Sequence, residues 1–133
     1  MAETTTPEGA TAFHRMLGLR WKSSDNGGVT VEMDLRDDLR GPAGSLEGGV
    51  VSTLADVAGA STAAMALTAM VATQQISISF LAPGRIGPVR ATGKPVRVGR
   101  KDAVVQVDIV DVGNEDRLMA VALVTIKALA NRS

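Results

Sequence analysis

Hydrophobic and polar positions along the chain follow two periods, which divide it into one long helix and a series of strands. From about Gly49 to Met70, alanine, leucine, methionine and valine dominate without a proline, over about six turns. This pattern predicts a helix that is apolar on nearly all sides, and other structure normally encloses such a helix. Its longest uncharged stretch, residues 57–72, is shorter than the roughly 20 residues of a membrane span. We therefore expect a buried helix and no membrane interaction.

Strand patterns lie on both sides of this helix. Before it, apolar residues alternate with polar ones over residues 29–35, which is typical of a strand with one buried face. After it, strand patterns cover residues 76–80, 89–98, 103–112 and 118–126. Because the loops between these strands are short, we expect antiparallel neighbours. The sequence predicts an α+β fold, in which one curved antiparallel sheet wraps around the long helix.

Three smaller features refine this prediction. Residues 11–19 predict a short helix that ends at Gly18. Pro95 cannot donate a ladder hydrogen bond, so it predicts an edge position or a bulge in its strand. The nearly continuous apolar run over residues 118–126 predicts a central strand.

The chain is expected to form a single domain over residues 11–130, because it contains no internal repeat and no linker long enough to divide it. Residues 1–10 are polar and are expected to be disordered. No basic segment followed by an apolar run is visible at the N-terminus, so we expect no signal peptide. Together with the absence of cysteine, this predicts a cytoplasmic protein.

Charge and composition exclude several kinds of site. Lys plus Arg and Asp plus Glu both number 14, and aromatic residues are few, so no nucleic acid partner is expected. The absence of cysteine excludes a thiol nucleophile and cysteine-ligated metals. His14, the sole histidine, lies far from the long helix in sequence, so no Ser-His-Asp triad can be placed. We expect no metal and no cofactor, and carboxylates and backbone amides must carry any chemistry.

Gly48 and Gly49 open the long helix. A helix start presents free backbone N–H groups and a partial positive charge, and glycines let a ligand approach them closely. Such a site can hold an oxygen that becomes an oxyanion. The alternative is that the two glycines serve only a turn.

Asp56 lies inside the same helix, between Ala55 and Val57. A carboxylate there costs free energy unless it is paired or hydrogen-bonded. It either caps a buried donor or is retained to attack a carbonyl or deprotonate water. Asp56 follows Gly48 by eight positions, which separates them by roughly 12 Å along the helix. If both act on one carbonyl, they must come from different subunits at a two-fold interface.

Four segments together resemble the hotdog-fold thioesterases. They are the run Gly-Ser-Leu-Glu-Gly-Gly at residues 44–49, Asp56, the run Ile-Ser-Ile-Ser-Phe-Leu-Ala-Pro at residues 76–83, and residues 98–100. The resemblance covers roughly residues 15–127 and is greatest to the phenylacetate-degradation and Arthrobacter-type 4-hydroxybenzoyl-CoA subgroup. It implies a hotdog fold, a homodimer or homotetramer, and hydrolysis of a small, aryl or medium-chain acyl-CoA to the free acid and CoA.

The resemblance also implies roles for individual residues. Asp56 matches the family's nucleophile or general base, and Gly48 matches the residue whose backbone N–H polarises the thioester carbonyl. Thr73 matches a Ser or Thr that helps to place the attacking water, although it could also be a threonine at the entry to a strand. Glu47 and Gly49, which flank Gly48, are expected to contact the substrate.

Basic residues in the predicted turns provide candidate contacts to the phosphates of CoA. In this family such turns often meet the nucleotide, and the neutral chain needs a local patch of positive charge for it. The candidates are Arg85, Arg97, Arg100 and Lys101. Each of them could equally be a solvated turn residue.

Two positions depart from the family pattern. Glu47 stands where the family usually has histidine, and Gly41 stands where it usually has asparagine or glutamine. An ionised Glu47 cannot donate a hydrogen bond and places negative charge near the developing oxyanion. A non-hydrolytic protein that binds an acyl-CoA or an acyl carrier is therefore the main alternative. A hotdog dehydratase ranks lower, because it needs a histidine near the aspartate and His14 lies in the wrong region.

Small residues of the long helix allow two interpretations. They could leave room beside the helix for a bulky or aryl acyl group, or they could let the helix pack closely against its neighbours. The residues concerned are Ala58, Gly59, Ala60, Ala63 and Ala64.

Overall fold

The computed structural model describes residues 5–7, 9–24 and 26–130. The helices are α1 (Ala12–Leu17) and α2 (Gly48–Leu67), with short 3₁₀ turns η1 (Asp37–Leu39) and η2 (Val112–Asn114). The strands are β1 (Arg20–Ser23), β2 (Val29–Met33), β3 (Val71–Phe80), β4 (Val89–Val98), β5 (Asp102–Asp111) and β6 (Arg117–Ala128).

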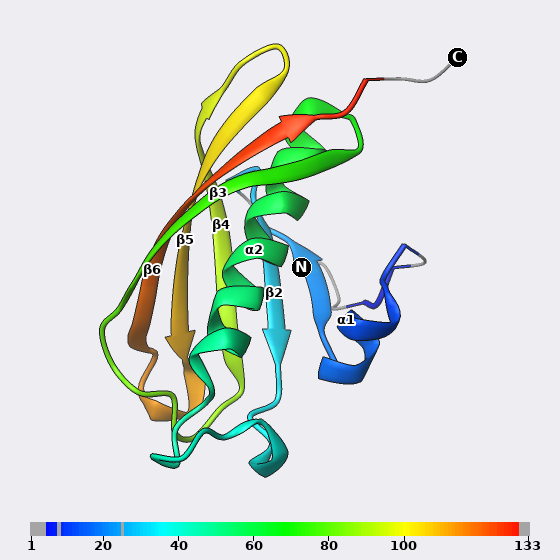
Figure 1. Cartoon of the computed structure of the whole chain (residues 1–133). Coiled ribbons are helices and arrows are strands. Elements are labelled where there is room, and N and C mark those ends of the chain that lie inside the picture. Colours follow the sequence, from blue (N-terminus) through cyan, green and yellow to red (C-terminus); the bar gives the residue numbers. More distant parts are fainter. Residues whose placement is uncertain (1–4, 8, 25, 131–133) are drawn as a thin grey trace.

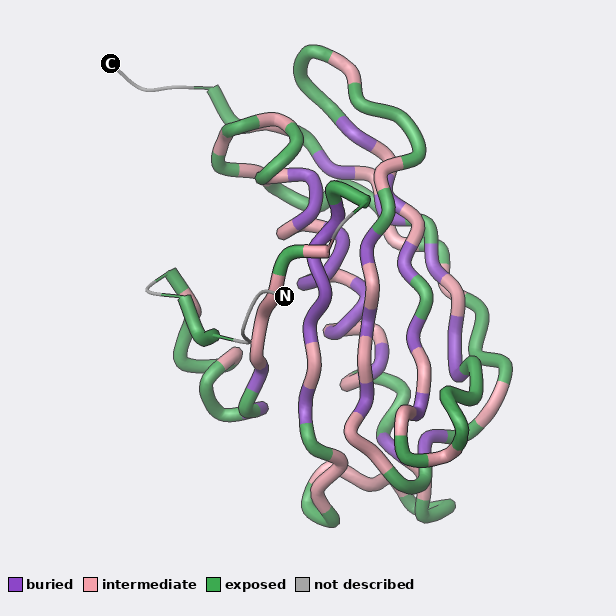
Figure 2. The backbone as a smooth tube through the Cα atoms, turned by 180° about the vertical axis from the view of Figure 1, so that it is seen from behind, coloured by how far each residue is buried: buried purple, intermediate pink, exposed green. Residues whose placement is uncertain are grey.

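The strands form one six-stranded sheet in the order β1-β2-β4-β5-β6-β3, and every neighbouring pair is antiparallel. The sheet curves around α2, which lies along its concave side (Figure 1). Buried and more exposed residues alternate along the strands (Figure 2), as expected when one face of a sheet covers a core. This arrangement confirms the predicted hotdog fold.

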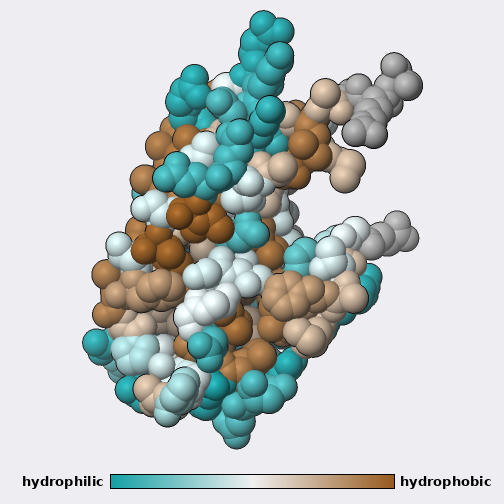
Figure 3. All heavy atoms as spheres, viewed as in Figure 1, coloured by the Kyte–Doolittle hydropathy of each residue, from teal (hydrophilic) through white to brown (hydrophobic). Residues whose placement is uncertain are grey.

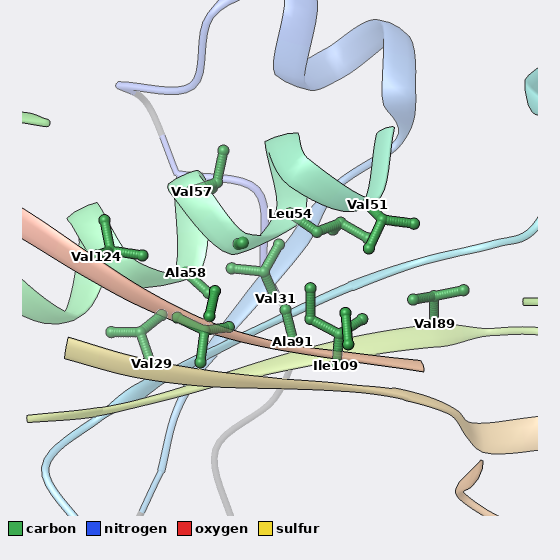
Figure 4. Packing of buried hydrophobic residues seen from close by; sticks show 14 of the residues in the cluster. Val29, Val31, Val51, Leu54, Val57, Ala58, Val89, Ala91, Ile109 and Val124 are labelled. Atoms are coloured by element: carbon green, nitrogen blue, oxygen red, sulfur yellow. The ribbon is translucent and has the colours of Figure 1, made fainter. Parts of the chain in front are cut away.

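Helix α2 packs on the sheet at very short range. In Figure 4, Leu54 and Ala58 of α2 meet side chains that rise from the strands below. A Cβ atom added at Gly59 would lie 2.9 Å from Cβ of Val124, and one at Gly93 of β4 would lie 2.9 Å from the carbonyl oxygen of Ala58. Glycine at these positions therefore permits the close approach. α2 has the length and hydropathy of a membrane span, but it serves as the core helix of this fold, as predicted.

The ends of the predicted elements differ from the observed ones. α2 begins at Gly48 and ends at Leu67, because Thr68 adopts a left-handed conformation (φ 48°) and closes the helix. β3 begins at Val71 and not near Ile76, because a bulge between Thr73 and Gln75 interrupts its alternation. The bulge predicted at Pro95 is present, between Pro95 and Arg97 of β4.

Two features of the topology were not predicted. β1 is a four-residue edge strand, too short to display a period of two. β3 and β4 are consecutive in the chain but are not neighbours, since β3 pairs with β6 at the opposite edge of the sheet. The prediction that short loops join neighbouring strands holds for β4, β5 and β6. It fails for residues 81–88, which connect the edge strand β3 to the interior strand β4.

The N-terminal segment folds back onto the sheet edge. Thr5 exchanges two backbone hydrogen bonds of 2.7 Å with Trp21 of β1, so this part of the predicted disordered segment lies against the domain. Residues 1–4 and 8 lie outside the described residues. α1 follows, with a capping box formed by Thr11 and His14 and a left-handed Gly18 (φ 71°) at its end, as predicted.

Candidate active site

Asp56 and Thr73 meet at the surface of α2. The Thr73 hydroxyl donates a hydrogen bond of 2.6 Å to Oδ1 of Asp56. Thr73 lies opposite the buried Ile126 in the β3–β6 ladder, so its side chain is on the helix side of the sheet. Asp56 is half-buried and accepts a hydrogen bond from no other described residue. The structure therefore brings these two predicted site residues into direct contact within one chain.

A cavity of about 290 Å³ adjoins this pair, and the surface is indented on the side of α1 (Figure 3). Its lining comes from the N-terminal segment, α1, β1, α2 and β3. The residues are Pro7, Gly9, Ala10, His14, Trp21, Asp56, Val57, Ala60, Ser61 and Thr73. His14 thus shares a cavity with Asp56, contrary to the prediction that it lies in the wrong region. Distance in the sequence was misleading here, because β1 was not predicted, and the chain around β1 brings His14 of α1 to the cavity that Asp56 lines.

Gly48 and Gly49 form the first turn of α2, beside a second cavity of about 370 Å³ that also contacts Phe80. A Cβ atom at Gly48 would lie 3.7 Å from the Phe80 ring, and one at Gly49 would meet nothing within 4 Å. Neither packing nor a positive φ therefore requires glycine here. In the described part of the chain, neither backbone N–H has an acceptor. The helix start can consequently receive an oxygen atom from a ligand.

Gly48 and Asp56 line different cavities, so one chain does not bring them together. This agrees with their expected separation along the helix. No group of three His, Asp or Glu side chains that could hold a metal ion occurs in residues 5–7, 9–24 and 26–130.

The two departures from the family pattern are neighbours in space. A Cβ atom added at Gly41 would lie 3.0 Å from Oε2 of Glu47. The Glu47 carboxylate therefore lies over Gly41, in space that a larger residue at position 41 would need. Glu47 is exposed, and it forms no ion pair with a described residue.

The four predicted basic residues do not form one cluster within the chain. Arg85 lies in the connection between β3 and β4, whereas the other three lie around the β4–β5 hairpin at the far end of β4. The ten residues of β4 span roughly 33 Å. Arg97 forms an ion pair of 3.2 Å with Asp102, while Arg100 and Lys101 are exposed at the tip of the hairpin.

Asp111, which the sequence did not single out, holds the connection that carries Arg85. It is fully buried, and the backbone N–H groups of residues 85–87 donate to its carboxylate at 2.8, 3.1 and 2.7 Å. Burial raises the pKa of Asp111, but these hydrogen bonds and the charge of Arg40 outweigh it, so the pKa lies below its ordinary value of 3.8. Asp111 is a structural carboxylate, with its acceptors satisfied by backbone.

Comparison with known proteins gives a consistent picture. A family model described as the thioesterase superfamily matches residues 43–117. The candidate esterase SSO2140 of Saccharolobus solfataricus is 28% identical over 103 residues, which are 77% of this chain and 74% of that protein. The candidate esterase Rv1847/MT1895 of Mycobacterium tuberculosis has a TM-score of 0.84 and 25% identity, and the match covers 92% of this chain and 100% of that chain. Thioesterase HI1161 of Haemophilus influenzae has a TM-score of 0.82 and 26% identity, and the match covers 90% of this chain and 84% of that chain.

Proposed function

The chain belongs to the thioesterase superfamily, and from this premise we propose that it is an acyl-CoA thioesterase that releases the free acid and CoA. The hydrogen bond between Thr73 and Asp56 beside a cavity carries this proposal. Asp111 illustrates how a structural carboxylate is satisfied, with three backbone donors. Among the described residues, Asp56 instead has a single hydroxyl donor, so its other oxygen is available to a ligand or water. This contrast favours a chemical role for Asp56 over a capping role.

In the proposed reaction, Asp56 acts either as a base or as a nucleophile. As a base, it takes a proton from the water that attacks the thioester carbonyl. As a nucleophile, it attacks the carbonyl itself, and water then cleaves the resulting anhydride. In both routes the C–S bond breaks, the CoA thiolate leaves and a proton returns to it. The N–H of Gly48 stabilises the oxyanion, and the Thr73 hydroxyl orients the carboxylate.

A second copy of the chain is needed to complete this site. Asp56 and Gly48 of one chain line different cavities, so the oxyanion donor must come from a partner subunit. β3 supports this proposal, because it is a ten-residue edge strand, and one of its sides pairs with no described strand. Phe80, which is 55% exposed, and the exposed Gly48 at the start of α2 line the same cavity.

We expect the purified protein to form at least a homodimer, and the family's habit of pairing dimers extends the proposal to a homotetramer. Multi-angle light scattering at micromolar concentration should give a mass of at least twice 13.7 kDa. A monomer that still hydrolyses thioesters would contradict the shared site.

The exposed cations of the β4–β5 hairpin are proposed to bind the phosphates of CoA. Reversing both charges, with Arg100→Glu and Lys101→Glu, should raise KM for acyl-CoA by roughly 30-fold, since two charge-assisted contacts of about 1 kcal/mol each are lost. KM for a truncated thioester that lacks the nucleotide should change much less. Arg117→Glu, which reverses an exposed charge at the start of β6, serves as the control. Equal effects on both substrates would remove the phosphate explanation.

A thiol-release screen over short-chain, long-chain and aryl acyl-CoAs tests the proposal as a whole. Turnover of at least one class supports hydrolysis. Tight, saturable binding without release of CoA would favour the alternative, a protein that binds an acyl-CoA or acyl carrier. The contact between Glu47 and Gly41 motivates that alternative, because both residues have lost the family's polar donors.

A further inference from the structure

We propose that Trp21 sets the length of acyl group that the site accepts. This inference rests on the proposed thioesterase function and assigns the acyl group to the cavity beside Asp56. In this assignment the indole ring of Trp21 is the end wall of the acyl pocket, so the preferred substrates carry a short chain or a single aryl ring.

A third cavity, of about 440 Å³, lies on the far side of Trp21. It shares Pro7, Trp21 and Ser61 with the cavity beside Asp56. The rest of its lining is half apolar and half polar or charged, and its residues are Val29, Ala64, Met65, Thr5, Lys22 and Ser23. The shared residues form the boundary between the two cavities.

The two cavities follow one side of α2. The first reaches from Asp56 to Ser61, and the second continues from Ser61 to Met65. These steps correspond to roughly 7 Å and 6 Å along the helix axis. The small side chains of Ala60 and Ala64 leave space on the side of the helix that lines the cavities, whereas Ala58 and Gly59 face the sheet. Under this proposal, the small residues serve both predicted purposes, on different faces of the helix.

Trp21 is held firmly at this boundary. Its indole N–H donates a hydrogen bond of 3.1 Å to the Ser61 hydroxyl, which ties β1 to α2. The ring of His14 lies against it, with 5.6 Å between ring centroids and a tilt of 60°. Its backbone is paired with Thr5 on one side and with Val31 on the other. A side chain fixed in this way acts as a wall, so a chain of many methylenes cannot extend past it.

The test is a chain-length profile of kcat/KM from butanoyl- to dodecanoyl-CoA. Trp21→Ala joins the two cavities, so the ratio for dodecanoyl-CoA over butanoyl-CoA should rise at least ~10-fold, since one methylene in an apolar pocket already changes kcat/KM by about that factor. Ser61→Ala removes the hydrogen bond that holds the indole ring but leaves the ring in place. It should raise the ratio of dodecanoyl-CoA to butanoyl-CoA by a smaller factor. Phe13→Ala, which removes an exposed aromatic ring that lines neither cavity, should leave it unchanged.

A ratio between substrates is insensitive to general loss of activity, and Trp21→Val provides a second variant if Trp21→Ala does not fold. An unchanged ratio in an active variant overturns the inference and leaves the thioesterase proposal standing. Trp21 is also the sole tryptophan, so its fluorescence reports directly on the pocket. A non-hydrolysable butanoyl-CoA thioether should change its emission, and CoA alone should not. That result would support the acyl pocket even if no thioester were hydrolysed, whereas equal responses to both ligands would overturn it.

Discussion

Replacing Asp56 with asparagine should lower kcat on the best acyl-CoA by about 100- to 10,000-fold, the usual contribution of a general base. Asparagine keeps the shape of the side chain and can still accept the hydrogen bond from Thr73, which is 2.6 Å long in the native site. It lacks the charge and basicity that either proposed route requires. Because Asp56 lies mid-helix and carries no phosphate contact, acyl-CoA binding and the thermal unfolding temperature should change little. Initial rates of thiol release, measured beside binding by calorimetry, separate these effects.

Ser52→Ala is the matched control for this substitution. Ser52 is half-buried on α2, one turn before Asp56. Among the described residues, its hydroxyl donates a hydrogen bond only to the carbonyl of Gly48 in the same helix. It should keep turnover within about a factor of two, as expected of a local helix contact. Near-normal turnover by Asp56→Asn would rule out Asp56 as base or nucleophile.

Replacing Asp111 with asparagine should lower the free energy of unfolding by at least ~2 kcal/mol. Hydrogen bonds to charged groups contribute about 1.5–3 kcal/mol, and a buried donor left without a partner costs a similar amount. Three backbone N–H groups depend on this carboxylate, and an amide offers them a single oxygen. Urea denaturation at neutral pH measures the difference. Asp108→Asn, an exposed change on the same strand β5, should cost under ~0.5 kcal/mol.

The pH dependence of the same variant provides an independent check. The pKa of Asp111 is lowered in the folded protein, so its stabilising effect is fully present above the ordinary value of 3.8 and disappears as pH falls through the folded value. The stability gap between the native protein and Asp111→Asn should therefore narrow in acid. A gap that stays constant from pH 7 to pH 2 would show that the carboxylate charge is not the source.

The parts of the fold that depend on residues close together in the chain could be predicted from the sequence. The apolar run of α2 and the irregularity at Pro95, predicted as an edge position or a bulge, each follow from residues close together in the chain. The pairing partner of β3 cannot be predicted in this way, because it depends on strands that are distant in the sequence. β6 has a buried face against α2 and pairs with β5 on one side, and β3 pairs with its other side. No pattern within residues 71–80 records that choice.

The candidate site shows the same division. Asp56 could be singled out as a carboxylate inside an apolar helix, and the resemblance to known thioesterases pointed to Thr73 and Gly48. His14 and Trp21 lacked such a signal, because their place beside Asp56 depends on how the N-terminal segment folds back through β1. Asp111 was overlooked for another reason. An aspartate at the end of a strand is usually a solvent-exposed turn residue, so its sequence position does not indicate burial.

The pairing of β3 with β6 also bears on how the protein is made. Val71 pairs with Ala128 and Phe80 with Ala120, so almost the whole of β3 can pair only after β6 is present. Contacts between such distant residues form slowly, because a long loop must close first. On the ribosome, α2 and the β4–β5 hairpin emerge before β6 exists, and Thr73 has no strand partner in its own chain until then. We therefore expect the hydrogen bond from Thr73 to Asp56 to be held in a fixed position only after β6 has paired with β3.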